Sequence, residues 1–242
     1  MIKKIGIIGA MDEEIQHLLA AMSERSDHLI YGFTFYEGMI GQQSVVIVRS
    51  GIGKVNASVT AVLLVEKFEV DFVMNTGTAG GLDEGLAVGD VVIAQALVHH
   101  DVDVTGFGYQ VGQMAGMPEV YYPDPQGIQA LRQAARTLEI EPVVGLIASG
   151  DQFVNDPEEV AKIRGNFPTV RAVEMESAAI AQALYLLRIP FVIVRCISDA
   201  GDQKATLSFD EFLVLAGSVS AQIVLTFIDQ VSEYFFGSRD LV

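Results

Sequence analysis

The residues best suited to chemistry follow a long apolar run in the C-terminal third of the chain. Arg195 lies within this run, and Ser198 and Asp199 end it and lead into a glycine-containing turn. Burial disfavours the charged form of a carboxyl group, so an Asp at this point has a raised pKa and can donate a proton near neutral pH. An equal alternative is that Asp199 caps the next turn and Arg195 pairs with a carboxylate. The motif thus indicates either a general acid or a structural element.

Three acids, Asp12, Glu13 and Glu14, follow another apolar run, at the start of an expected helix. The helix dipole favours negative charge there whether or not catalysis occurs. This explanation accounts for at least two of the three acids. It leaves one that can face the end of the sheet and activate a water molecule.

Glu174 and Glu176 flank Met175 where a short strand gives way to a helix of small residues. An ionised carboxylate there can accept hydrogen bonds from two neighbouring sugar hydroxyls, while methionine packs against a sugar or thioether. Two solvated acids at a helix start are the competing interpretation.

Residues 75–81 form a turn with little side-chain bulk, so its backbone amides and Thr78 can approach a ligand closely. The turn lacks the GxGxxG pattern of dinucleotide sites, and residues 51–54 do not complete a phosphate-binding Walker loop. We therefore expect neither a nicotinamide nor a nucleoside triphosphate cofactor.

A metal site is a weaker hypothesis, suggested by His99, His100, Asp101 and Asp103. Successive side chains of a strand point to opposite faces, so these four cannot converge on one ion. We expect no metal.

Apolar β-branched runs alternate with helix-like segments, which indicates an α/β protein. We expect strands at residues 3–10, 44–50, 72–76, 88–104, 143–149, 172–174 and 191–198, and a hairpin at 32–43. We expect helices from about Asp12, from Lys54, and at 126–138, 157–164, 177–187 and 209–234. Ligands of such sheets collect beyond the carboxyl ends of the strands, where the motifs above lie. No linker or repeat divides the chain, so we expect one domain over residues 1–242.

The composition excludes several classes of protein. Half of the 242 residues are hydrophobic and 19% are charged, which is typical of a folded chain. The net charge of −16 disfavours nucleic acid and anionic membranes as partners. The single cysteine, Cys196, fits a reducing cytoplasm, and no signal peptide is evident at the start of the sequence. The longest uncharged stretch, 212–228, is short for a bilayer and is interpreted as a buried helix.

Taken together, the motifs resemble the 5'-methylthioadenosine/S-adenosylhomocysteine nucleosidases of the purine nucleoside phosphorylase superfamily. The resemblance rests on residues 5–14, 50–55, 172–176 and 197–199 and covers nearly the whole chain. It implies a single-domain, three-layer α/β/α fold around a mixed, strongly twisted central sheet. It also implies hydrolysis of the N-glycosidic bond of both nucleosides, and of 5'-deoxyadenosine, to adenine and the free sugar.

The resemblance assigns roles to individual residues. Asp199 would protonate adenine N7, Glu14 would activate the attacking water, and Glu176 would hold the ribose hydroxyls beside Met175. The remaining matched positions would bind other parts of the nucleoside: Phe153 and Val154 the adenine, Met11, Ile52 and Phe209 the 5'-alkylthio group, and Thr78, Ala79, Gly80 and Ser198 nearby groups. Ala115 falls where some relatives have proline.

The resemblance further implies a cytoplasmic homodimer of methionine salvage, with Phe107 reaching into the neighbouring active site. A phosphorylase is the main rival, although Asn75 stands where related phosphorylases tend to carry a phosphate-binding arginine. A futalosine or adenosine nucleosidase, or a non-catalytic nucleoside-binding protein, are further alternatives.

Overall fold

The computed structural model describes residues 2–199 and 205–236, and of residues 205–211 and 231–236 it describes the backbone alone. Strands and helices alternate along most of the chain. The strands are β1 (Lys4–Gly9), β2 (Ser23–Ile30), β3 (Phe33–Ile40), β4 (Gln43–Arg49), β5 (Phe72–Gly81), β6 (Val91–His99), β7 (Val143–Ser149), β8 (Val170–Glu174) and β9 (Phe191–Asp199). The helices are α1 (Asp12–Ala20), α2 (Lys54–Phe68), the short 3-10 helix η1 (Thr105–Phe107), α3 (Pro125–Thr137), α4 (Pro157–Asn166), α5 (Ser177–Leu187) and α6 (Ala205–Phe236).

In the described part of the chain, nine strands form one mixed sheet in the order β2-β3-β4-β1-β5-β8-β7-β6-β9. β9 also pairs with β5 in parallel, with Val73 opposite Phe191, so the strands from β5 onward close on themselves. β5 therefore has three neighbours: β1 along its first half, β9 along most of its length, and β8 at Gly80 and Gly81. All ten residues of β5 are buried, as expected for a strand surrounded on every side.

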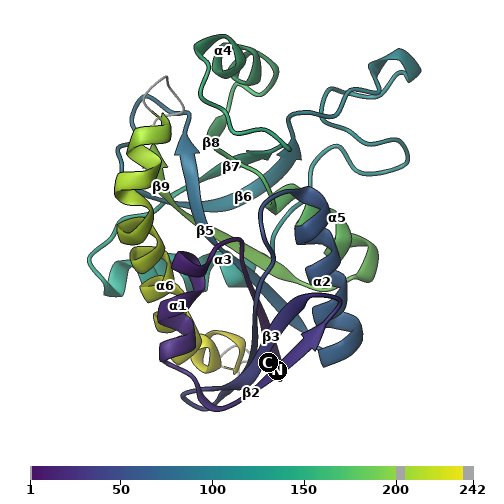
Figure 1. The fold of residues 1–242 in the computed structure, drawn as a ribbon. Helices are drawn as coiled ribbons and strands as arrows, with labels where there is room; N and C mark the ends of the chain where they lie inside the picture. The colour runs from purple at the N-terminus through teal and green to yellow at the C-terminus, as the bar shows by residue number, and fades with distance from the viewer. Residues whose placement is uncertain (1, 200–204, 237–242) are drawn as a thin grey trace, which may run out of the picture.

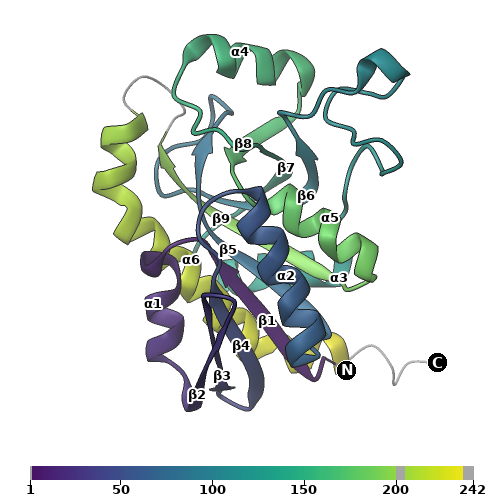
Figure 2. The ribbon, with the colours of Figure 1, turned by 45° about the vertical axis from the view of Figure 1, so that its right-hand side comes forward.

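Helices cover the sheet in two groups (Figures 1 and 2). On one side α2 and α5 pack against each other and bury an apolar cluster that includes Ala61, Leu64 and Ile180. On the other side α6 packs against α1 and α3, and its Phe227 shares a second cluster with Leu131 of α3. The expected three-layer α/β/α arrangement with a mixed central sheet is confirmed.

The structure corrects the expected strands in the N-terminal quarter. Residues 32–43 were expected to form a hairpin, but residues 33–40 are the single strand β3, which pairs antiparallel with β2 and with β4. Gly32 and Gly41 both have positive φ and lie in the turns before and after it. β2 was not expected because its sequence, SERSDHLI, is polar and mostly exposed, as suits an edge strand.

By length and composition, residues Phe212–Gln230 of α6 are the one segment in the described parts of the chain that would span a membrane. In the structure this segment packs against β5, β9, α1 and α3, and Ala221, Val224 and Phe227 are buried in the core. The expected C-terminal helix is therefore confirmed, and it buries one face, while Val214 and Leu215 are exposed.

Candidate active site

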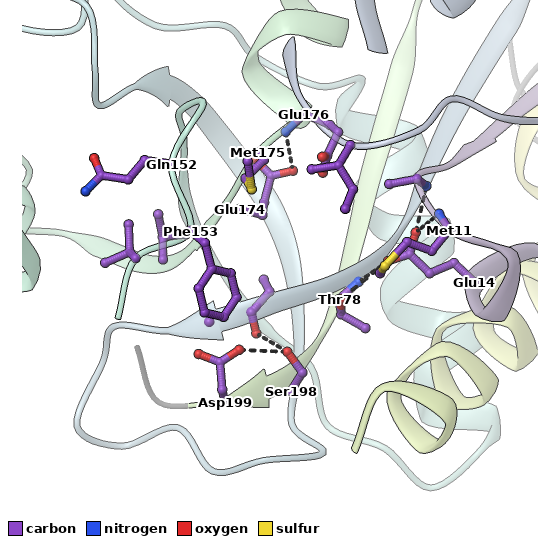
Figure 3. A pocket seen from close by; sticks show the side chains of 16 residues that line it. Met11, Glu14, Thr78, Gln152, Phe153, Glu174, Met175, Glu176, Ser198 and Asp199 are labelled. Atoms are coloured by element: carbon purple, nitrogen blue, oxygen red, sulfur yellow. Dashed lines mark hydrogen bonds between the residues drawn. The ribbon is translucent and has the colours of Figure 1, made fainter. Parts of the chain in front are cut away.

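A cavity of about 310 Å³ lies at the carboxyl ends of β1, β5, β8 and β9 (Figure 3). This is the place where ligands of parallel α/β sheets collect. Its lining combines acidic and apolar side chains and comes from segments far apart in the sequence: Ala10, Met11, Glu14, Ile52, Thr78, Ala79, Gly80, Gln152, Phe153, Val154, Val173, Glu174, Met175, Glu176, Ser198 and Asp199.

Glu14 is held in the cavity wall by backbone amides at both of its carboxylate oxygens. It is the third residue of α1, so Oε2 reaches back to the amides of Ala10 at 2.7 Å and Met11 at 3.1 Å. Oε1 accepts from the amide of Thr78 at 3.0 Å and from its hydroxyl at 3.3 Å. The other acids of this turn lie outward, since Asp12 is exposed and pairs with Arg49. Glu14 is thus the one acid of the three that faces the sheet end.

Burial raises the pKa of Glu14, although Arg195 and the amide donors act to lower it. The close approach of Glu14 and Arg195 requires a glycine at position 77, because a Cβ there would collide with both Arg195 Nη1 and Glu14 Oε1. The result is a carboxyl group with high proton affinity held in one orientation, which is what a general base needs.

Glu174 is the most heavily hydrogen-bonded carboxylate of the site. It accepts from the Ser149 and Ser177 hydroxyls, from the amides of Glu176 and Ser177, and from the Arg195 guanidinium. Burial acts to raise its pKa, but Arg195 and the hydroxyl and amide donors outweigh burial and hold the pKa below its usual range. Glu174 is therefore a permanent anion in the wall.

Glu176 has a different environment two residues further on. Oε1 accepts from the amide of Gly53 at 3.0 Å, and Oε2 lies 3.7 Å from Arg195 Nη2. Burial, together with the neighbouring charge of Glu174, raises the pKa of Glu176 to about 8. A ligand with vicinal hydroxyls can supply the hydrogen bonds that this carboxyl lacks.

Asp199 lies across the cavity from Glu14, at the end of β9 (Figure 3). It is buried, and the Ser198 hydroxyl donates to its Oδ2 at 2.9 Å. The neighbouring Arg195 points away from it into the Glu174 network, so the expected pairing of Arg195 with a carboxylate is confirmed. Two buried carboxyl groups, one on α1 and one at the end of β9, thus line the same cavity.

Apolar side chains fill the rest of the lining. Phe153 is 41% exposed and projects toward Asp199, whereas Val154 beside it is buried (Figure 3). Met11 lies beside Glu14, and Met175 lies beside Glu176. An aromatic face for a flat base and soft thioethers for a sugar or alkylthio group are therefore present together.

The structure brings most of the expected site residues together. Twelve of the fourteen line the cavity: Met11, Glu14, Ile52, Thr78, Ala79, Gly80, Phe153, Val154, Met175, Glu176, Ser198 and Asp199. Phe107 does not, since it lies on η1 and is 84% exposed. The side chain of Phe209 lies outside the described residues. The lining also includes Ala10, Gln152 and Val173, to which no role was assigned, and Glu174, which the sequence offered only together with Glu176.

Three of the four residues considered for a metal site, His99, Asp101 and Asp103, make other polar contacts. His99 hydrogen-bonds Gln182 at 2.9 Å, and Asp101 pairs with Lys54 at 2.6 Å. Over the described ranges, no three His, Cys, Asp or Glu side chains are grouped in a way that could hold a metal ion.

Comparisons with known proteins agree with this geometry. A family model described as the phosphorylase superfamily matches residues 4–229. The 5'-methylthioadenosine/S-adenosylhomocysteine nucleosidase of Exiguobacterium sp. is 49% identical over 223 residues, which cover 92% of this chain and 96% of the relative.

Solved structures give the same result. The nucleosidase of that type from Neisseria meningitidis, in complex with methylthio-immucillin-A, is 48% identical, with a TM-score of 0.93 over 95% of this chain and 100% of that chain. A futalosine hydrolase mutant of Helicobacter pylori is 31% identical, with a TM-score of 0.91 over 95% and 100%.

Proposed function

Because the chain belongs to the 5'-methylthioadenosine/S-adenosylhomocysteine nucleosidase family of the phosphorylase superfamily, we propose that it hydrolyses the N-glycosidic bond of these two nucleosides. The products are adenine and the free 5-thioribose sugar. The observation that carries the proposal is the placing of Glu14, Glu176 and Asp199 around one cavity that also holds Phe153.

Each residue has a role that its surroundings suit. Asp199 donates a proton to N7 of adenine as the base leaves, and Phe153 and Val154 hold the base. Glu14 takes a proton from the water that attacks the anomeric carbon, and its raised pKa suits it to do so. This division of labour resembles that of inverting glycosidases, in which one carboxyl assists departure and the other prepares water.

The sugar is held between these two groups. Glu176 accepts hydrogen bonds from the ribose hydroxyls. These donors favour the charged form of its carboxyl group, and in that form it stabilises the positive charge that develops on the sugar. Met175 packs beside the ribose. Met11 and Ile52 receive the 5'-alkylthio group, while Thr78, Ala79, Gly80 and Ser198 complete the polar and backbone lining.

Phosphorolysis is disfavoured by the charges around the cavity. Among the described residues that line it, four are acidic and there is no lysine or arginine. Asn75 is turned into the interior, where its Nδ2 donates to the Ile8 carbonyl and its Oδ1 accepts from Ser177 and Arg195. A phosphate anion at Glu14 would meet like charge.

Futalosine is a second candidate substrate, favoured by the structural similarity to the futalosine hydrolase mutant at 31% identity. The N-glycosidic bond is the bond cleaved in all these nucleosides, and the 5' substituent is one of the groups that distinguish them. The lining around Met11 and Ile52 is apolar, which favours a methylthio group over a polar extension.

The direct test is adenine release from 5'-methylthioadenosine by the purified protein, with and without phosphate. Free methylthioribose at a rate independent of phosphate is expected. A requirement for phosphate with formation of a sugar 1-phosphate would identify a phosphorylase, and release only from futalosine would reassign the substrate.

Two isosteric variants test the assigned roles. Asp199→Asn and Glu14→Gln are each expected to lower kcat at least about 1,000-fold, because each removes a proton transfer. Unchanged circular dichroism would show that the fold is retained. Near wild-type activity in either variant would remove that residue from the mechanism.

We also propose a cytoplasmic homodimer acting in methionine salvage. Support for a dimer comes from an apolar groove of about 550 Å³ between α2 and α5, whose lining includes the exposed side chains of Val55, Leu186 and Met114. Phe107, exposed on the segment that extends from the body after β6, can then reach the neighbouring cavity (Figure 2).

A further inference from the structure

Three residues outside the set of expected site residues form a closed ring of hydrogen bonds beside the cavity. The Lys54 amide donates to Asp151 Oδ1 at 2.7 Å, and the Asp151 amide donates to Asp101 Oδ2 at 2.9 Å. Asp101 Oδ1 accepts from Lys54 Nζ at 2.6 Å, which closes the ring. We call these three residues the clasp. It joins the start of α2, the segment after β6 and the segment after β7.

The clasp adjoins the ribose-binding side of the cavity through Gly53. The amide of Gly53 donates to Glu176 Oε1, and the next amide, that of Lys54, belongs to the clasp. These two amides stand at the N-terminus of α2, where the helix itself offers no backbone acceptor, and no side chain of the helix caps them. Gly53 has a φ of +98°, and a Cβ there would lie 3.1 Å from Asp151 Oδ1. Two carboxylates from other segments thus anchor this helix end.

The clasp adjoins the base-binding side through Asp151. Two residues beyond it, Phe153 projects into the cavity, followed by Val154 (Figure 3). Asp101, whose side chain is 25% exposed, accepts the hydrogen bond from the Asp151 amide. Burial acts to raise the pKa of Asp101, but the hydrogen bonds from Lys54 and the Asp151 amide outweigh burial and lower it. Asp101 is therefore charged at neutral pH, as an ion pair with Lys54 requires.

We propose that the clasp is a positioning element. It holds the base-binding segment after β7 at a fixed position relative to Glu176, so that one nucleoside can contact Phe153 with its base and Glu176 with its ribose. The inference rests on the proposed function. Lys54 and Asp101 do not line the cavity, so they act through Phe153 and Glu176. Contacts to the base exist before and during the reaction, and loosening them weakens substrate and transition state alike.

The expected signature is a rise in KM with little change in kcat. In Asp101→Asn, the amide can keep one acceptor for Asp151 but presents N–H groups or a neutral oxygen to Lys54. We expect KM for 5'-methylthioadenosine and the Kd of adenine to rise about tenfold, with kcat within about threefold of wild type. Adenine alone reports the base side without the ribose.

The experiment compares Asp101→Asn, Lys54→Met and the double variant with the wild type, each in its native oligomeric state. The double variant should show no larger rise in KM than either single variant, because both remove the same contact. Lys4→Met is the matched control, since the Lys4–Glu37 pair at 2.7 Å has similar exposure and lies at the opposite end of β1 from the cavity. The control should leave KM and adenine Kd unchanged.

KM and adenine Kd of Asp101→Asn within twofold of wild type would overturn the proposal, as would an equal rise in Lys4→Met. Additive effects in the double variant would also overturn it. If the wild type releases no adenine, the proposed function fails on its own, and the adenine Kd still decides whether the clasp orders the base-binding segment.

Discussion

The guanidinium of Arg195 on β9 donates to the carboxylate of Glu174 at the end of β8. The side chain of Arg195 is fully buried, and that of Glu174 is 3% exposed. The pair ties together two strands that enclose the cavity. It also places a fixed positive charge behind Glu14 and Glu176, where it acts to lower the pKa of both.

Removing Glu174 would leave the buried guanidinium of Arg195 without its nearest anion, with Glu176 Oε2 at the longer distance of 3.7 Å. We expect Glu174→Gln to lower the free energy of unfolding by about 3–5 kcal/mol at pH 6, as is typical for a broken buried ion pair. Urea unfolding measures it. Glu141→Gln, which removes the exposed pair with Arg136, should leave the unfolding midpoint nearly unchanged. Equal effects of the two substitutions would show that burial of the Arg195 pair has no energetic consequence.

The raised pKa of Glu176 makes stability depend on pH. Its pKa in the folded protein is about 8 against an ordinary 4.5, so the folded state binds this proton more tightly than the unfolded chain. The contribution of Glu176 to stability is complete below about pH 4.5 and is lost as pH rises through about 8.

Glu176→Gln stays neutral at every pH and tests this dependence. The variant should gain stability relative to wild type as pH rises from 5 to 9, as measured by urea midpoints at several pH values. Glu14 contributes a dependence of the same sign in both proteins, and the difference between them includes the loss of the repulsion between Glu14 and Glu176. A constant difference between variant and wild type would mean that Glu176 titrates normally.

At Gly77 the addition of a single methyl group should lower kcat. In Gly77→Ala the new Cβ would collide with Glu14 and Arg195, so the carboxylate must leave its amide donors. We expect kcat to fall at least about 100-fold, because a displaced base loses its alignment with the water. Gly32→Ala, at a turn with positive φ and open space around it, is the control, and its kcat should be unchanged. Normal kcat in Gly77→Ala would show that Glu14 has room to move without consequence.

Phe107 lends itself to a complementation test. If it acts in the neighbouring site, dimers that combine one Phe107→Ala subunit with one Glu14→Gln subunit contain one site with both residues intact. We expect mixed dimers to recover activity well above that of either variant alone, measured after subunit exchange and purification with two different tags. Mixed dimers without such recovery would place Phe107 outside the neighbouring site.

Much of the fold follows from local pattern, and the misses have physical reasons. Strands β1, β7 and β9 are apolar runs, and the apolar pattern predicts their first and last residues to within one or two positions. β2 is an edge strand without a buried face, so its polar sequence carries no strand signal. β5 was expected to end at Thr76 but continues to Gly81, because pairing with β8 and β9 holds a glycine-rich segment that has little strand preference of its own.

The site was anticipated to a similar extent. Acids after the apolar runs of β1, β8 and β9 indicated residues 12–14, the pair Glu174 and Glu176, and Asp199. The family resemblance then singled out Glu14 and Glu176. Glu174 was recognised as a candidate only together with Glu176. Which of the two forms the close ion pair with Arg195 depends on how the chain bends after β8, and the sequence does not reveal that bend. The clasp was missed because its three members come from segments with no common motif, and only the folded chain brings them together.

The pairing of β5 with β9 has a consequence for how the protein is made. It joins residues more than one hundred positions apart, Val73 with Phe191 for example, and pairings of such long range are slow to form. Glu14 is synthesised early and Asp199 late, so a ribosome-bound chain that has released only its first two thirds contains the proposed base without the proposed acid. Catalytic competence therefore arrives as the last strand docks, and not gradually as the chain lengthens.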